Sequence, residues 1–484
     1  MSPLLDLAAI GLLVAVTVIV GFAGLRFSRT TGDFFVASRS VGSFFNASAI
    51  SGEYLSAGTF LGLAGLVLLS GSEGFWFPIG YAAGYLLVLL FVAAPLRRSG
   101  AYTIPDFVQA RTESMGARRI TSLLVLVIGW LYIVPQLHGA ALTLGVVADL
   151  PPWVGAVLVA VLVGGIVAAG GMRAITAVQA FQYWLKLTAL AVPVIFLLIA
   201  LSGREPAIDP HAVFPAESGP GGADMYATVS LLIALLLGTI GLPHVLVRFY
   251  TSPTGASARR TTVIVIAMVS VFYAVSGTMG LIARVVAPDM AQPGVADTVV
   301  FVLPSRLFPG PVGDLLTALI VAGAFAAFLA TSSGLVVSLA GVVSQDLFDG
   351  SVRSFRISAV LCTIVPLAVA LLTVADGLVS SVGLVFVVTA SSLSPVIVLA
   401  VWWRRLTARG AIAGMATGAV SCGAALLVAA LVGPEAGPWQ VLLAQPAAWT
   451  IPLATLVVII VSLRDRRRPL SAERYLARLH VPDA

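Results

Sequence analysis

Two apolar stretches of this sequence contain polar residues, glycines and a proline where an ordinary membrane helix would continue. The first is Ser51-Gly52-Glu53-Tyr54-Leu55-Ser56-Ala57-Gly58, and the second is Gly238-Thr239-Ile240-Gly241-Leu242-Pro243. A helix broken at membrane depth is costly unless the break lines a cavity, because backbone groups in hydrocarbon must be hydrogen-bonded. A break also frees N–H groups that can hold an anion and carbonyls that can replace the water around a small cation. Either segment alone could simply allow close helix packing, but the pair predicts a site for an anion and a cation.

The composition is that of a membrane protein with many spans. Of 484 residues, 59% are hydrophobic and 10% are charged, against roughly 25% charged in an ordinary soluble domain, and the mean hydropathy is +1.05. These values exclude a disordered chain, a coiled-coil rod and a sizeable soluble catalytic domain. The two cysteines, Cys362 and Cys422, lie in apolar runs, which leaves no disulfide framework and no cysteine metal site.

Thirteen runs are long enough to cross a bilayer core of about 30 Å as helices. Their approximate limits are 3–26, 42–70, 74–95, 119–147, 152–171, 180–202, 225–247, 261–286, 312–343, 356–375, 378–402, 411–433 and 447–463. The first run lacks a basic segment before it and a small-residue cleavage site after it, so we expect a retained helix and not a signal peptide. The predicted fold class is an all-α polytopic membrane protein with about 13 transmembrane helices.

The positions of the basic residues predict the orientation. With the N-terminus outside, 24 of the 27 Lys and Arg residues fall in cytoplasmic segments, as the positive-inside rule requires. We therefore expect a multi-pass protein of the cell membrane with a cytoplasmic C-terminus. We interpret the arginine-rich stretch 464–469 as a stop-transfer anchor, and Lys186, near the inner start of the sixth span, as a side chain that snorkels to the interface.

The two interrupted spans lie five spans apart. Broken helices at matching places in two halves are typical of secondary transporters built from inverted repeats, with the binding site between the repeats. We predict a helix outside the repeats at residues 1–30, a first repeat at 31–203 (spans two to six) and a second repeat at 225–405 (spans seven to eleven). Spans twelve and thirteen occupy 406–463, and a basic cytoplasmic tail occupies 464–484.

Five short motifs together resemble the sodium/solute symporter family, and most closely its cation/acetate branch. They are Gly32 to Arg39, Gly170 to Ala174, Gly238 to Phe249, Ser344 to Leu347, and Ser394-Pro395. Each motif is weak alone, and their order and spacing carry the resemblance. The resemblance implies a LeuT-like core of two inverted five-helix repeats and alternating access driven by a cation gradient.

The resemblance also implies a single cation between the broken second span and the ninth span. Its ligands would be the carbonyls of Gly52 and Leu55, the carbonyl of Ala327, and the side chain of Thr331. Many sodium-coupled relatives have two adjacent hydroxyl residues on the ninth span, where this chain has Ala330 and Thr331, with Ser332 one residue later. Because Na⁺ prefers several hard oxygen ligands, both Na⁺ and H⁺ stay open as the transported cation.

Six polar residues are candidates for binding the solute, three at positions that line the cavity in the family and three because they are polar at mid-span. They are Tyr54, Ser56 and Thr59, and Gln136, Thr239 and Thr389. Each alone could equally be a residue that hydrogen-bonds two helices. No arginine lies at mid-span in this reading, so we expect helix ends and hydroxyl groups to hold a small monocarboxylate such as acetate.

Ionisable residues inside spans are functional candidates by default. Glu53, beside the break of the second span, could carry a proton, support the cation indirectly or accept backbone N–H groups. His138 could line the cavity or pair with a backbone carbonyl. His244 and Arg248, at the inner end of the seventh span, could close an inner gate or anchor the helix at the interface.

The sequence predicts a secondary active symporter and not an enzyme, because it has no H-E-x-x-H motif, paired-aspartate metal motif or nucleophile elbow. The expected partners are a small carboxylate, the coupling cation and membrane lipids, with no cofactor, nucleic acid or obligatory protein partner. A carrier of proline, pantothenate or a sugar is the main alternative. A channel or a transporter-like sensor is less favoured, since the about 20 residues after the last span are too few for a signalling domain.

Overall fold

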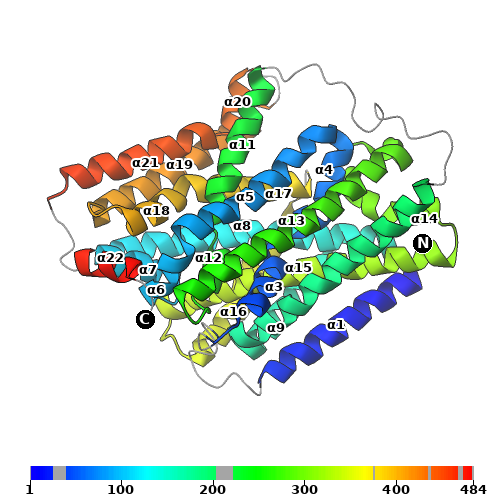
Figure 1. The fold of residues 1–484 in the computed structure, drawn as a ribbon, viewed down its shortest axis with the longest axis horizontal. Helices are drawn as coiled ribbons and strands as arrows, with labels where there is room; N and C mark the ends of the chain where they lie inside the picture. The colour runs from blue at the N-terminus through cyan, green and yellow to red at the C-terminus, as the bar shows by residue number, and fades with distance from the viewer. Residues whose placement is uncertain are drawn as a thin grey trace.

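The computed structural model describes residues 2–25, 37, 40–202, 222–373, 377–433, 438–466 and 472–481. Within these ranges every regular element is a helix and there is no strand (Figure 1), so the predicted all-α class is confirmed. The motif Gly32 to Arg39 lies outside the described residues apart from Ala37, and so does the second half of the stretch 464–469.

The helices follow in chain order with their bounds. They are α1 (Pro3–Leu25), α3 (Ser43–Tyr54), η2 (Gly58–Gly62), α4 (Leu63–Ser70), η3 (Gly71–Phe75), α5 (Trp76–Phe91), α6 (Ala93–Ser99), α7 (Ile104–Thr112), α8 (Met115–Ala148), α9 (Pro152–Ser202), α11 (Gly222–Gly241), α12 (Pro243–Phe249), α13 (Gly255–Val286), η4 (Pro288–Met290), η5 (Ala296–Thr298), α14 (Val299–Leu307), α15 (Pro311–Asp346), α16 (Val352–Leu372), α17 (Leu378–Ser392), α18 (Ser394–Trp402), α19 (Ala408–Val432), α20 (Pro438–Ala444), α21 (Ala447–Arg464) and α22 (Ala472–His480).

Nine helices of the described ranges are long and apolar enough to cross a membrane, and eleven are if each of two bent helix pairs is one span. Helix α9 contains two of the expected spans, 152–171 and 180–202. It has 51 residues, which is about 76 Å of helix at 1.5 Å per residue, whereas a bilayer core is about 30 Å thick. Gly171 interrupts it with a φ of 57° and a ψ of −161°, a conformation that favours glycine. The number of thirteen spans stays a prediction.

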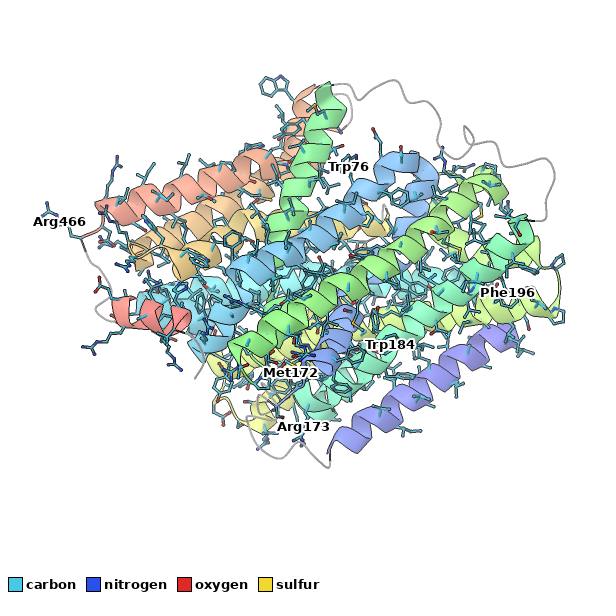
Figure 2. The ribbon with its side chains drawn as sticks, in the orientation of Figure 1. Trp76, Met172, Arg173, Trp184, Phe196 and Arg466 are labelled. Carbon is cyan, nitrogen blue, oxygen red and sulfur yellow. The ribbon has the colours of Figure 1, made fainter. Side chains whose placement is uncertain are left out.

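Apolar side chains are exposed on the outside of the bundle. Trp184 and Phe196 are 46% and 43% exposed, and Figure 2 shows them following Arg173 along the second half of α9. Trp76, at the start of α5, is 46% exposed as well. Such a surface is costly in water and favourable in hydrocarbon. The predicted class of multi-pass membrane protein is therefore confirmed.

In the described residues, interruptions occur within the expected spans 42–70, 225–247 and 378–402. Helix α3 ends at Tyr54, Leu55 is extended with a φ of −76° and a ψ of 91°, and the chain resumes as the π-helix η2. Helices α11 and α12 meet at Leu242 with a bend of 46°. Both breaks lie where the sequence predicts them. The third, a bend of 41° between α17 and α18, is not among the predicted breaks, although Pro395 in the first turn of α18 removes a backbone donor.

Residues next to the first break and those of α12 are buried, and α11 runs from the middle of the bundle to its upper edge (Figure 1). Helix α3 packs against α9, α13 and α15, and α11 packs against α5 and α17. Helix α1 lies on one flank beside α9, whereas α19 and α21 lie on the opposite flank. Elements of both predicted repeats therefore surround each break.

Ion pairs fasten one end of α15 to α7 and α8. Asp346 lies 2.5 Å from Arg118, and Arg118 lies 2.7 Å from Asp106. The Ser122 hydroxyl also donates to Asp346. Because Asp346 belongs to the motif Ser344 to Leu347, this part of the resemblance has a structural reason: it holds the ninth expected span against the fourth.

Candidate functional site

The break in α3 frees three backbone carbonyls, and side chains from two other helices satisfy them. The Lys186 ammonium of α9 donates to the carbonyls of Gly52 and Leu55, the second at 2.8 Å. The Thr331 hydroxyl of α15 donates to the Glu53 carbonyl at 2.6 Å. Unpaired carbonyls in an apolar interior are costly, so these bonds explain how the interruption is tolerated.

The chain after the break is satisfied from α8. The Ala57 N–H donates to the side-chain oxygen of Gln136 at 2.8 Å, and the Thr59 hydroxyl donates to the Ser56 carbonyl at 3.0 Å. Gln136 therefore caps the second half of the broken helix. Gln136 and Thr59, two of the candidates for binding solute, are hydrogen-bonded to the broken helix itself.

Lys186 is the only lysine of the sequence, and it is fully buried. The expectation that it snorkels to the membrane interface is wrong. The second half of α9 begins near Met172 and not near residue 180, which puts Lys186 at the middle of that half. An ionisable side chain at such a depth marks a functional site by default.

Glu53 and Arg248 form a buried ion pair next to the same break. Arg248 Nε lies 2.6 Å from Glu53 Oε2, and the two side chains are 1% and 2% exposed. The other two guanidinium nitrogens of Arg248 donate to Thr176 Oγ1 at 2.8 Å and to the side-chain oxygen of Gln179. Anchoring of Arg248 at the interface is therefore wrong, and so is the expectation that no arginine lies at mid-span. The reason is the bend at Leu242, which keeps α12 inside the bundle.

We call Glu53, Arg248 and Lys186 the charged cluster. With all three side chains ionised, the one carboxylate and two cations carry one excess positive charge. The cluster joins α3 and α9, from the first predicted repeat, to α12 from the second. An excess of positive charge in a low-dielectric interior attracts an anion.

Two glycines make room for this arrangement. A Cβ on Gly334 of α15 would lie 1.9 Å from Glu53 Oε1, and a Cβ on Gly52 would lie 2.2 Å from the carbonyl oxygen of Gln179. Side chains at these two positions would collide with the neighbouring helix or with the carboxylate. The absence of a Cβ is therefore what lets α9 and α15 approach α3 so closely.

The two predicted broken helices meet through Tyr54 and Thr239. Their hydroxyl oxygens are 3.2 Å apart, and Tyr54 also lies within hydrogen-bond distance of the Tyr81 carbonyl, at 3.2 Å. The Thr239 hydroxyl donates to the Leu235 carbonyl at 2.8 Å. The two interrupted helices therefore contact each other inside the protein.

Around Tyr54 lies a group of buried aromatic side chains that we call the aromatic cluster. Its members come from α3, α5, α8, α13 and α17, and they are Tyr54, Tyr81, Tyr85, Tyr132, Tyr273 and Phe386. Ring centroids are 4.6 Å apart for Tyr54 and Tyr85, and 4.5 Å apart for Tyr81 and Phe386. Within the described part of the chain, four of the hydroxyl groups have no hydrogen-bond partner within 3.5 Å, those of Tyr81, Tyr85, Tyr132 and Tyr273. The Tyr132 hydroxyl lies near those of Tyr81 and Ser56.

Two neighbouring residues also lack partners. Ser56 Oγ and both ring nitrogens of His244 are buried without a hydrogen bond to any described residue, and the His244 ring lies 5.1 Å from that of Tyr132. An unsatisfied buried polar group costs about 1–3 kcal/mol. Several such donors in one place favour a polar guest, and a carboxylate can accept several of their hydrogen bonds.

Some expected site residues have other contacts. Two of the four expected cation ligands, the carbonyls of Gly52 and Leu55, bind the ammonium described above. The Ala330 carbonyl accepts from the Gln179 amide at 2.7 Å, and Ala327 lies one turn earlier in the uninterrupted helix α15. The cation-binding role of this set stays a prediction.

Two more candidates are bonded to backbone. The Thr389 hydroxyl of α17 donates to the Val385 carbonyl at 2.6 Å, although its methyl group lies close to the second break at Gly241. His138 Nε2 lies 3.1 Å from the carbonyls of Ala370 and Thr373. Pairing with a backbone carbonyl, one of the two alternatives for His138, is the arrangement found.

The sequence motifs and the two facing breaks lead to one family. A profile of the sodium:solute symporter family matches residues 34–418. The chain belongs to the sodium:solute symporter family. A monocarboxylic acid transporter of Corynebacterium glutamicum is 29% identical to this family member over 524 residues, which cover 98% of this chain and 94% of that protein. An uncharacterized symporter of Bacillus subtilis is 31% identical over 440 residues, which cover 86% of this chain and 84% of that protein.

A solved structure shares the fold of this family member. The substrate-bound, outward-open state of a Na⁺-coupled sialic acid symporter aligns with a TM-score of 0.74, covering 96% of this chain and 98% of that one, at 14% sequence identity. The LeuT-like fold that the resemblance implies is therefore confirmed.

Sequence reasoning misses the tyrosines of α5, α8 and α13 as a group. A usable signal exists for two pairs, because Tyr81 and Tyr85 are four residues apart and so are Tyr132 and Gln136, which places each pair on one helix face. No local pattern indicates that the two faces meet. Lys186 is detectable in principle, since it is the one lysine of an apolar run.

Proposed function

We propose that this protein is a secondary active symporter that takes up a small monocarboxylate, such as acetate or pyruvate, together with inward Na⁺ or H⁺. The observation that carries the proposal is the aromatic cluster, whose partnerless hydroxyl groups lie between two broken helices and beside the charged cluster. The name of the Corynebacterium relative supports the substrate class.

The chemistry of both clusters suits a short carboxylate. Neutral phenol and serine hydroxyl groups donate to the anion without burying a further charge, and hydrogen bonds to an ionised acceptor are the strong ones. The excess positive charge of the charged cluster stabilises the anion in the low-dielectric interior. The aromatic rings, Phe386 among them, offer apolar surface to a small tail. A dicarboxylate would need a second cationic partner, so we expect a monocarboxylate.

Alternating access would use contacts between the two proposed repeats. We propose that 31–203 and 225–405 are inverted repeats that rock against each other in the cell membrane, with the N-terminus outside and the C-terminus in the cytoplasm. Glu53 and Arg248 connect these repeats, and so do Tyr54 and Thr239. Opening to either side therefore has to change contacts at the solute site. In this role Arg248, with His244 beside the aromatic cluster, belongs to the gate.

Counterflow in proteoliposomes tests the proposal. Vesicles loaded with unlabelled pyruvate should transiently accumulate labelled pyruvate while ionophores hold the membrane potential at zero, which a channel cannot do. Pyruvate serves better than acetate because the stronger acid crosses lipid more slowly in its neutral form, and protein-free vesicles give the background. Propionate and acetate should compete. Competition by proline without competition by propionate would contradict the substrate class and favour another carrier of this family.

Replacing Tyr132 with phenylalanine is expected to raise the KM for pyruvate at least about tenfold, because the ring remains while a hydrogen bond to the anion, worth about 1.5–3 kcal/mol, is lost. The matched control is Tyr226→Phe, since the Tyr226 hydroxyl donates to the Gln445 carbonyl at 3.0 Å, away from the cluster. Initial rates of counterflow measure both. An unchanged KM in Tyr132→Phe would remove Tyr132 from the solute site.

A further inference from the structure

We propose that Lys186 is a built-in cation that takes the place of a transported Na⁺, so that this carrier binds no sodium at the break in α3. The inference rests on the proposed function as a cation-coupled carrier, and it decides between the two cations left open there. The ammonium lies where the family resemblance expects the ion.

The ammonium occupies the oxygens that a sodium ion would need on α3. Lys186 Nζ donates to the carbonyls of Gly52 and Leu55, which are the two backbone ligands that the resemblance assigns to the cation. Both an ammonium and Na⁺ are monovalent cations that satisfy carbonyls freed by a helix break. The Lys186 stem comes from the middle of the second half of α9 and is fully buried, so the charge is held in the interior.

The expected ligands on α15 are engaged in other hydrogen bonds, while the Ser332 hydroxyl and Glu53 Oε1 are buried without a hydrogen bond to a described residue. Thr331 has the only side-chain oxygen of the expected ligands, and its hydroxyl donates to the Glu53 carbonyl at 2.6 Å. Ala330 has no side-chain oxygen, and its carbonyl accepts from Gln179 at 2.7 Å. Hard cations bind several oxygens at once, whereas an ammonium has three donors and is directional. The set fits the ammonium better than it fits sodium.

The charges that face Lys186 disfavour a second cation beside it. Glu53 of α3 is the acidic group beside the ammonium, and Arg248 of α12 already pairs with it at 2.6 Å. Thr331 of α15, which donates to the Glu53 carbonyl at the break in α3, is neutral. A sodium ion about 4 Å from the ammonium would be repelled enough to weaken its binding about a thousandfold.

Position 186 is the one basic position of this sequence that is occupied by a lysine. Every other Lys or Arg position of the sequence is an arginine, including those of the cytoplasmic segments. A lysine carries a compact point charge on an unbranched stem, whereas the guanidinium of arginine is a planar fork. The compact group is the one that can lie between two carbonyls of a single interrupted turn.

Sodium binding to the purified protein tests the inference without any solute. For the wild type we expect no saturable binding of radioactive sodium, and no change in the thermal unfolding midpoint when sodium chloride replaces choline chloride. Lys186→Arg keeps the charge and should also bind no sodium.

Pyruvate counterflow gives a second measurement. The wild type should transport at the same rate in choline and in sodium. Lys186→Met keeps the unbranched stem and loses the charge, so its rate in choline should fall about a hundredfold, because two buried carbonyls lose their partner, and sodium should restore part of it. Gly165→Ala is the matched control in the same helix, since its Cβ would have nothing within 4 Å, and it should transport like the wild type.

Three results would overturn the inference: saturable sodium binding by the wild type, counterflow by the wild type that sodium accelerates, and a Lys186→Met variant that transports at the wild-type rate in choline. A failure of the proposed function has a different signature. It would be an absence of counterflow for every monocarboxylate in both salts, while sodium binding to the wild type and to Lys186→Arg would still report on Lys186.

Discussion

Glu53→Gln is expected to lower the free energy of unfolding by about 3–5 kcal/mol and to reduce pyruvate counterflow to background, because it leaves the buried Arg248 guanidinium without its counter-ion. Thermal unfolding in detergent and counterflow in proteoliposomes measure the two effects. In the double variant Glu53→Gln/Arg248→Gln neither charge is left unpaired, so part of the stability should return. Counterflow should not return, because the ionic contact between the two proposed repeats is lost.

The matched control is a solvent-exposed ion pair of the same protein. Asp289 lies 2.5 Å from Arg306 in an exposed position, where solvent screens the interaction, so Asp289→Asn should leave stability and transport nearly unchanged. A Glu53→Gln protein as stable as the wild type would contradict the buried pair. The same variant tests the predicted proton-carrier role of Glu53, because a residual uptake with unchanged pH dependence would remove that role.

Gly334→Ala is expected to abolish counterflow by displacing Glu53 without altering any charge. The new Cβ would lie 1.9 Å from Glu53 Oε1, 2.0 Å from its Cδ and 2.6 Å from its Cγ. The whole side chain must therefore move, and its bond to Arg248 at 2.6 Å must break. Separating a buried pair costs about 3–5 kcal/mol, so we expect a loss of at least about a hundredfold in initial rate.

Gly423→Ala is the matched control for this substitution. Gly423 lies in a helix, α19, and its Cβ would have nothing within 4 Å. Replacing glycine by alanine in a helix stabilises it slightly, so Gly423→Ala should fold and transport like the wild type. If Gly334→Ala retained wild-type counterflow, the position of the Glu53 carboxylate would not matter for transport.

Both Glu53→Gln and Gly334→Ala change the same set of contacts between the two proposed repeats. Glu53 touches Arg248 through its carboxylate and Thr331 through its carbonyl, while Gln179 bridges Arg248 and the Ala330 carbonyl. Helices α3 and α9 are thus tied to α12 and α15 at the depth of the break. A movement of one proposed repeat against the other has to rearrange these bonds, which links the break in α3 mechanically to the contacts between the two proposed repeats.

The sequence by itself determined the membrane class, the family and the two breaks it predicts. Hydropathy sets the spans because burial in lipid depends on the composition of about 20 consecutive residues. Glycine and proline act within one helical turn, so the interruptions at Gly52 to Ser56 and at Gly241 to Pro243 are readable locally. The prediction that Lys186 lies near the membrane interface failed because the second half of α9 begins near Met172, whereas the apolar run of the sixth expected span begins near residue 180.

The tertiary structure decided which polar groups meet. Glu53 and Arg248 are 195 residues apart, and Lys186 and Leu55 are 131 residues apart. The four partnerless tyrosines come from three helices whose apolar faces look alike in the sequence. Such encounters depend on helix packing and on close approaches at glycines such as Gly334, which no short window of sequence records. The physical reason is that hydropathy depends on consecutive residues, whereas these ion pairs and hydrogen bonds join residues that are distant in the sequence and close in space.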